Sequence, residues 1–193
     1  MKTLNQRLDL IKPKVLTPEF RSGQGLANEI NFWIFDYAPE DEMEVRAHVL
    51  YLQQSIMAER DDIRIVIYDL FDLMVEALDQ KGYLDSVLKM ERDKGSESVL
   101  NPIKKTLRLT LDDDSIVNRI CEGLNPCTDI IFIIGVGKSY PIIRSHTVLN
   151  NLHSRIDRNP VVMFFPGVYE SELRLFGEIT DDNYYRAFRL IER

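Results

Sequence analysis

The sequence predicts a single three-layer α/β domain over residues 1–193, in which a mostly parallel sheet of about five strands is flanked by helices. Short apolar runs alternate with segments whose apolar residues recur every three or four positions, which is typical of strands alternating with amphipathic helices. Two runs, residues 130–134 and 161–165, are apolar without interruption and suit parallel strands covered on both faces. With 193 residues, 45% of them hydrophobic, the chain can bury one compact core.

The N-terminal half is expected to alternate helix and strand. A helix is predicted over residues 4–15, and Pro13 must interrupt or end it. The helix over residues 40–60 is predicted from the spacing of its apolar residues, which are Met43, Ala47, Leu50 and Ile56. The other expected elements are a turn-rich stretch at 17–25, strands at 31–37 and 64–69, helix at 70–92 interrupted at Gly82, and an exposed charged segment at 91–98.

The C-terminal half continues with helix at 99–124 and a βαβ unit. Its strands are 129–134 and 161–165, and Pro141 is placed in the first turn of a helix over 141–157. A short strand is expected at 173–176. The chain end is expected to form a helix over 183–190, or alternatively an edge strand at 188–191.

Charge and composition narrow the function classes. The 24 basic and 31 acidic residues give a net charge of −7, which argues against strong autonomous DNA binding, although a local basic patch would survive this average. The N-terminus lacks the apolar core of a signal peptide, and no apolar run is long enough to span a membrane. With only Cys121 and Cys127 as cysteines, the sequence predicts a cytoplasmic protein without a disulfide framework.

The segment Gly135–Ser139 resembles a phosphate-binding loop, because it follows a strand and ends in Gly-Lys-Ser. That motif requires a glycine five positions before the second glycine, and Phe132 occupies the place. We therefore expect a tight strand-to-helix turn and no functional phosphate-binding loop. The same segment should anchor the next helix through Ile142 and Ile143.

Asp36 and Asp69 each end a predicted strand. The carboxyl ends of parallel strands form the ligand crevice of such sheets, so the two carboxylates could hold Mg²⁺ there. An aspartate after a strand also commonly caps the following helix, and this interpretation is favoured. Gly167 belongs to the same crevice.

Other candidate metal ligands are excluded by spacing. His146 and His153 lie two helical turns apart, roughly 10 Å, which is too far for one shared ion. The two cysteines lack the spacing and companion ligands of a zinc site. The sequence therefore predicts no metal and no cofactor. Two acidic segments, 40–42 and 112–114, are expected to begin helices and could also act as contact patches.

Several separated stretches together resemble the BrxB family, a component of bacterial BREX phage-defence systems. These stretches are residues 17–20, 25–29, 32–42, 135–152, 160–167, 173–177 and 183–190. The resemblance implies a cytoplasmic antiviral accessory protein that acts beside a PglZ-type alkaline-phosphatase-like protein, a large ATPase and a DNA methyltransferase. It transfers no catalytic residue.

Two functions remain open at this point. The first is a non-catalytic adaptor that binds the PglZ-type protein through an exposed face, and the second is a nucleotide- or metal-binding enzyme or sensor that uses the crevice. For the adaptor, aromatic and arginine side chains dominate interface energies, so Tyr185, Arg186 and Arg189 are the candidate partner-binding residues. Alternatively, Tyr184 and Phe188 complete the core and the arginines are solvated.

Overall fold

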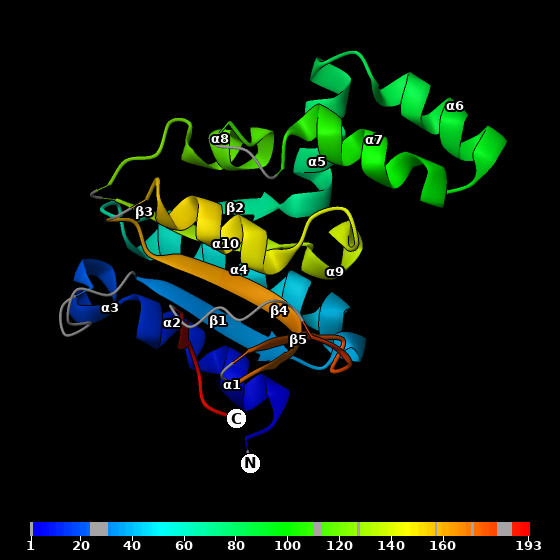
Figure 1. Ribbon diagram of the computed structural model, residues 1–193. Coiled ribbons are helices and arrows are strands. Elements are labelled where there is room, and N and C mark those ends of the chain that lie inside the picture. Colours follow the sequence, from blue (N-terminus) through cyan, green and yellow to red (C-terminus); the bar gives the residue numbers. More distant parts are fainter. Residues whose placement is uncertain are drawn as a thin grey trace.

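A computed structural model describes residues 2–23, 31–109, 113–126, 128–156, 158–170, 172–180 and 187–193. The chain folds into three layers, with a sheet between two layers of helices (Figure 1). The predicted α/β fold is therefore confirmed. The strands are β1 (Phe32–Tyr37), β2 (Arg64–Asp69), β3 (Asp129–Ile134), β4 (Val161–Tyr169), β5 (Leu173–Leu175), β6 (Ile179–Thr180) and β7 (Phe188–Arg189).

The strands of the main path run in the order β2-β3-β4-β1-β7, and every neighbouring pair among them is parallel. β5 and β6 extend β4 in antiparallel fashion, so the described sheet has seven strands, two more than the expected number. Gly167 makes the β4–β5 pairing possible, because a Cβ at this position would collide with the carbonyl oxygen of Arg174.

Helices cover both faces of the sheet. The described helices are α1 (Leu4–Asp9), α2 (Ile11–Val15), α3 (Pro18–Ser22), α4 (Glu42–Glu59), α5 (Leu70–Gln80), α6 (Leu84–Lys94), α7 (Glu97–Leu107), α8 (Ser115–Cys121), α9 (Val136–Ser139) and α10 (Ser145–His153), with a 3₁₀ turn η1 (Pro39–Asp41). Alternate residues of β1 face two separate cores: Trp33 and Phe35 pack with α1 to α4, whereas Phe32 and Ile34 pack with α5 and α7 to α10.

The N-terminal elements differ from the expectation. The predicted first helix is broken at Leu10, and Pro13 lies in the first turn of α2, where its missing N–H costs little. The stretch expected to be turn-rich contains α3, because Thr17 caps the helix and Pro18 occupies its first position. Gly23 ends α3 in the left-handed conformation, with a φ of 63°.

Helix α4 is present as predicted, but of the four apolar residues whose spacing predicted it only Ile56 is buried. Val45, Val49, Leu52 and Ile56 are the buried residues, whereas Met43, Ala47 and Leu50 are exposed. Both faces of this helix carry apolar residues, so their spacing alone did not identify the buried one.

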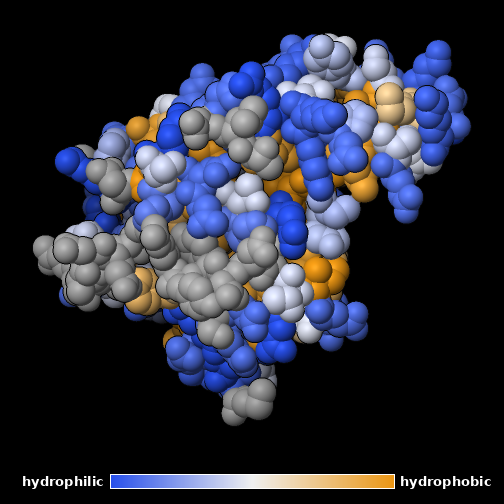
Figure 2. Space-filling model, in the orientation of Figure 1, coloured by the Kyte–Doolittle hydropathy of each residue, from blue (hydrophilic) through white to orange (hydrophobic). Residues whose placement is uncertain are grey.

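Helices α5 and α6 follow the helix predicted over residues 70–92, which breaks near Gly82 as expected, whereas the helix expected over 99–124 is divided into α7 and α8. Helices α6 and α7 form a hairpin that projects beyond the rest of the molecule (Figure 1). The charged segment 91–98 forms its tip and is exposed over residues 91–97, which confirms that expectation. The face seen in Figure 2 is mostly hydrophilic, with hydrophobic residues visible between charged ones.

Two further predictions are corrected near the C-terminal half. Pro141 does not begin a helix, because it follows α9 in a turn with a cis Tyr140–Pro141 bond, and α10 starts only at Ser145. Ile143 is buried, whereas Ile142 is half-buried, so Ile143 is the stronger anchor. The alternative of an edge strand at the chain end is confirmed by β7, and the helix expected from residue 183 lies largely outside the described residues.

Candidate functional site

The crevice expected at the carboxyl ends of the strands is divided into two centres. β1 continues into α4 on one face, whereas β2 and β3 continue into helices on the other face. Ligands of open α/β sheets bind where the strand order changes in this way. Asp36 and Asp69 end strands that are three positions apart in the sheet, roughly 14 Å, so they cannot share one metal ion.

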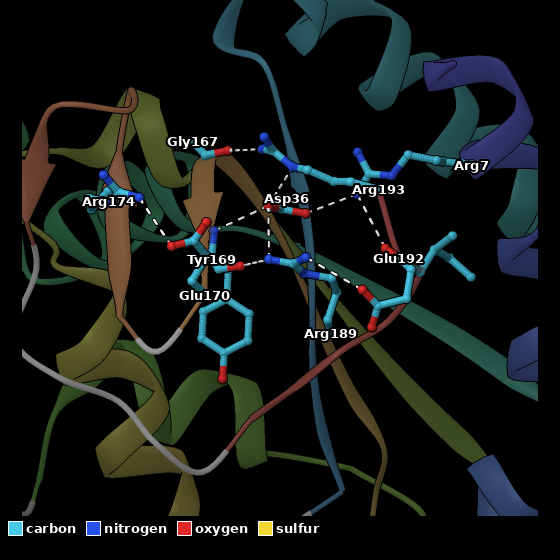
Figure 3. A network of polar contacts seen from close by, with 10 residues as sticks. Arg7, Asp36, Gly167, Tyr169, Glu170, Arg174, Arg189, Glu192 and Arg193 are labelled. Atoms are coloured by element: carbon cyan, nitrogen blue, oxygen red, sulfur yellow. Dashed lines mark hydrogen bonds and ion pairs between the residues drawn. The ribbon is translucent and has the colours of Figure 1, made fainter. Parts of the chain in front are cut away.

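Asp36 is fully buried and accepts hydrogen bonds from three distant segments (Figure 3). Its Oδ1 accepts from Arg7 Nη2 at 2.9 Å, and its Oδ2 accepts from Arg193 Nε at 3.0 Å and from the backbone N–H of Tyr169 at 3.2 Å. Arg193 also donates to the carbonyl oxygen of Gly167 at 2.9 Å. One carboxylate therefore joins α1, β4 and the C-terminal segment to the end of β1.

Two more contacts tighten this Asp36 network. Arg189 Nη2 lies 3.9 Å from Asp36 Oδ2 and donates to the carbonyl oxygen of Tyr169, and Arg7 donates to the carbonyl oxygen of Ile191 at 3.4 Å. Burial lowers the pKa of Arg7, although the Asp36 carboxylate opposes this shift. Because arginine remains charged well above neutral pH, the network contains a buried ion pair.

Asp69 has a more local role, which confirms the favoured interpretation of a helix cap for this residue; for Asp36 that interpretation was wrong, because its carboxylate bonds distant segments and does not cap η1 or α4. Its Oδ1 accepts from the backbone N–H groups of Phe71 and Asp72, at 3.0 and 3.3 Å, and so caps α5. Its Oδ2 forms an ion pair with Lys138 at 2.6 Å and a longer one with Arg46 at 3.6 Å.

The segment Gly135–Ser139 forms the predicted tight turn and the short helix α9. Gly135 adopts a φ of 76°, and a Cβ there would collide with Asp69 Oδ1, so glycine is required on two grounds. Lys138 turns toward Asp69 and lies 3.5 Å from Asp72, and Phe132 is buried within β3. The lysine that would contact a phosphate in a true loop is thus paired with carboxylates of the same chain.

The structure brings the predicted crevice residues together in two pairs: Asp36 with Gly167, and Asp69 with the segment 135–139. Within the described part of the chain, no group of three or more His, Cys, Asp or Glu side chains is placed to hold a metal ion. His146 and His153 are half-buried on α10, Cys121 is a free thiol, and Cys127 lies outside the described residues.

The predicted partner-binding residues are only partly described. Arg189 belongs to the Asp36 network and its side chain is 21% exposed. Tyr185 and Arg186, like Tyr184, lie outside the described residues.

The two acidic segments differ. In the first, residues 39–42 begin η1 and α4 as predicted and remain partly accessible. In the second, Asp114 caps α8 through Ile116 and Val117, and burial raises its pKa, whereas Asp112 lies outside the described residues.

Sequence reasoning missed the cations that occupy these two centres. Arg7 and Arg193 lie 29 and 157 residues from Asp36, and Lys138 lies 69 positions after Asp69, so no local pattern could pair them. The one available signal was general, since a buried aspartate requires a cation or several donors.

Comparisons with known proteins extend over the whole chain. The family model described as "BREX protein BrxB" matches residues 66–190. The chain is 51% identical over 194 residues to BREX protein BrxB of Bacillus cereus strain H3081.97, covering all of both chains. It is 30% identical over 190 residues to BREX protein BrxB of Escherichia coli O9:H4 strain HS, covering 97% of this chain and 92% of the relative. No solved structure matches. None of the described helices combines the length and hydropathy needed to cross a lipid bilayer.

Proposed function

The chain belongs to the BrxB family of BREX proteins, and we propose that it is a non-catalytic adaptor of a BREX phage-defence complex. Its partner in this proposal is a PglZ-type alkaline-phosphatase-like protein, with the BREX ATPase and methyltransferase as further candidates. The place of action is the cytoplasm.

The observation that carries this proposal is the internal pairing at the carboxyl ends of the strands. Asp36 is held by Arg7 and Arg193, and Asp69 caps α5 and pairs with Lys138. A catalytic carboxylate in this position would need to reach a substrate, and a phosphate-binding lysine would need to be unpaired. Because these side chains are bonded to other groups of the same chain, the arrangement favours a protein that binds its partner through an outer surface.

A second candidate is an anion-dependent sensor at the Asp36 network, which one observation favours. A cavity of about 170 Å³ beside the network is lined by Lys2, Arg7, Asp41 and Arg193, among others. The Nε of Arg7 is buried without a hydrogen-bond partner among the described residues. An anion such as a nucleotide phosphate could compete with Asp36 for these cations, but only by breaking a buried ion pair.

Affinity capture tests the adaptor proposal. The tagged protein is co-expressed with each BREX component separately, and we expect the PglZ-type protein to be retained at a defined stoichiometry. If none of the components is retained, the adaptor proposal is wrong. Calorimetric titration with Mg·ATP and with inorganic phosphate tests the second candidate, the anion-dependent sensor. A sensor would bind one of these ligands with micromolar affinity, and Arg193→Gln would weaken that binding.

The predicted contribution of Tyr185 and Arg186 to partner binding is tested with a variant that leaves Arg189 unchanged. Because Arg189 lies beside Asp36, Arg189→Glu would place a second carboxylate in a buried network and disturb the fold. Arg186→Glu combined with Tyr185→Ala avoids this problem. Full retention of the PglZ-type protein by that variant would exclude Tyr185 and Arg186 as docking residues.

A further inference from the structure

The outward face of α4 carries an uncovered row of apolar side chains. Met43, Leu50 and Met57 are 73, 52 and 43% exposed, and Tyr51 beside them is 57% exposed. The opposite face of the same helix is fully occupied, because Val45 and Val49 are completely buried against the sheet. We call the row Met43, Ala47, Leu50, Gln54 and Met57 the α4 stripe.

The spacing of the α4 stripe matches one side of a helix pair. Its members are separated by four, three, four and three residues, which is the seam spacing of a coiled coil. The row spans 14 residue steps, roughly 21 Å, enough to contact about four turns of a second helix. The small Ala47 allows close approach, and Gln54 is a polar seam residue of the kind that fixes register.

A groove lies beside the middle of the α4 stripe. It has a volume of about 440 Å³, and its lining is half apolar or aromatic (Leu50, Ile67, Tyr68, Leu73 and Ile134) and half charged (Arg46, Asp69, Asp72, Glu76 and Arg119). β2 is the outermost strand on this side of the described sheet. A partner that covers Leu50 can therefore also bury apolar side chains in the groove, which a single exposed helix could not offer.

Charge at the two ends of α4 indicates what kind of helix fits. Glu40, Asp41 and Glu44 lie at its N-terminal end, and none of them forms an ion pair with another described residue. The last turn of α4 has no basic residue, and Glu59 there pairs with Lys12. The other cations near α4 are also paired, because its C-cap residue Arg60 pairs with Asp62 and Arg46 pairs with Asp69. A second copy of α4 would thus bring only cations that already have an acidic partner, whereas a helix with unpaired Lys or Arg in its last turns would bring free cations to the acidic end when packed antiparallel.

We propose that the α4 stripe docks an antiparallel amphipathic helix of another BREX protein, with apolar residues at seam spacing and Lys or Arg in its last turns. This inference rests on the proposed adaptor function and identifies the surface that performs it. The apolar seam supplies affinity, and the acidic end of α4 sets the direction of the bound helix.

Leu50→Glu tests the apolar seam, with Leu88→Glu as its matched control. Leu88 is 46% exposed on α6, so both variants place a charge at a half-exposed leucine of a helix. Both should unfold like the wild type in a thermal scan. We expect Leu50→Glu to weaken binding of the PglZ-type protein at least tenfold, whereas Leu88→Glu leaves it within twofold.

Glu44→Lys tests the acidic end, with Asp85→Lys as the control. Both acids are exposed and lie in the first turn of a helix, so both changes oppose a helix dipole. We expect a three- to tenfold loss of affinity for Glu44→Lys that shrinks as salt is raised, and no loss for Asp85→Lys.

The outcomes separate the two proposals. If the wild type retains the PglZ-type protein and Leu50→Glu retains it equally well, the α4 stripe is not the docking surface, while the adaptor function stands. If the wild type retains no BREX component, the adaptor function itself is wrong. If light scattering finds that the wild type is a dimer and Leu50→Glu a monomer, the α4 stripe binds a second copy of this chain, and the proposal of a helix from another protein is wrong.

Discussion

The carboxyl edge of the sheet and the outward face of α4 differ in how their side chains are used. At the sheet edge, Asp36 and Asp69 occupy the position where open parallel α/β sheets generally bind ligands, yet both are bonded to groups of the same chain. On α4, Met43 and Leu50 are exposed with no described residue covering them. The carboxylates at the sheet edge thus stabilise the fold, although their position is typical of a ligand site. The accessible apolar surface lies instead on α4, whose other face packs in the core.

The sheet edge also differs within itself. Asp36 is completely buried and joins segments that are distant in the chain, whereas Asp69 mainly bonds the helix that follows it directly. Removing each carboxylate should therefore lower the free energy of unfolding by a different amount, whereas changing the exposed Leu50 of the α4 stripe should leave stability nearly unchanged.

Asp36→Asn is expected to have the largest effect on stability. The change leaves the buried guanidinium of Arg7 without its counter-charge, which typically costs about 3–5 kcal/mol. Urea unfolding followed by circular dichroism measures the loss. Asp62→Asn is the control, because Asp62 lies at the surface and solvent screens its ion pairs with Arg60 and Arg21, so its loss should be far smaller than that of Asp36→Asn. Equal losses for the two variants would contradict the structural role of Asp36.

Asp69→Ala is expected to have a moderate effect. It removes the acceptor for two backbone N–H groups at the start of α5, and loss of such a cap costs about 1–2 kcal/mol. Asp69→Asn keeps an acceptor and removes only the charge, so it should cost less than half as much in the same urea unfolding experiment. If Asp69→Asn loses more than half of the stability that Asp69→Ala loses, the ion pair with Lys138 contributes more than the helix cap.

Lys138→Ala is expected to have a small effect. Its side chain is 30% exposed, and its ion pair with Asp69 should contribute less than about 1 kcal/mol, so the melting temperature should fall by only a few degrees. Neither the wild type nor this variant should bind Mg·ATP in calorimetric titration. Micromolar binding that disappears in the variant would restore the nucleotide-binding alternative.

The sequence predicted most of the fold because the central strands are nearly continuous runs of apolar residues. The segments 32–37 and 129–134 are buried at every position, and such runs bounded by turn residues are hard to misassign. The α3 helix was missed because Thr17-Pro18 occurs both in turns and at helix starts. On α4, apolar residues on both faces left the buried face undetermined.

The candidate site was less predictable for a physical reason. Ion pairs such as Arg193 with Asp36 join residues 157 positions apart, and nothing in the local sequence at either end reports the contact. The tight turn at Gly135–Ser139 was predictable because it depends on residues that are neighbours in the chain, Phe132 and Gly135–Ser139.

The most direct test compares Lys138→Ala and Leu50→Glu in one titration against the PglZ-type protein. Lys138 lies at the sheet edge and Leu50 on the α4 stripe, and both variants should remain folded. The account predicts wild-type affinity for Lys138→Ala and at least a tenfold loss for Leu50→Glu. If only Lys138→Ala loses affinity and Leu50→Glu binds as the wild type does, the partner binds at the carboxyl edge of the sheet, which would contradict the account.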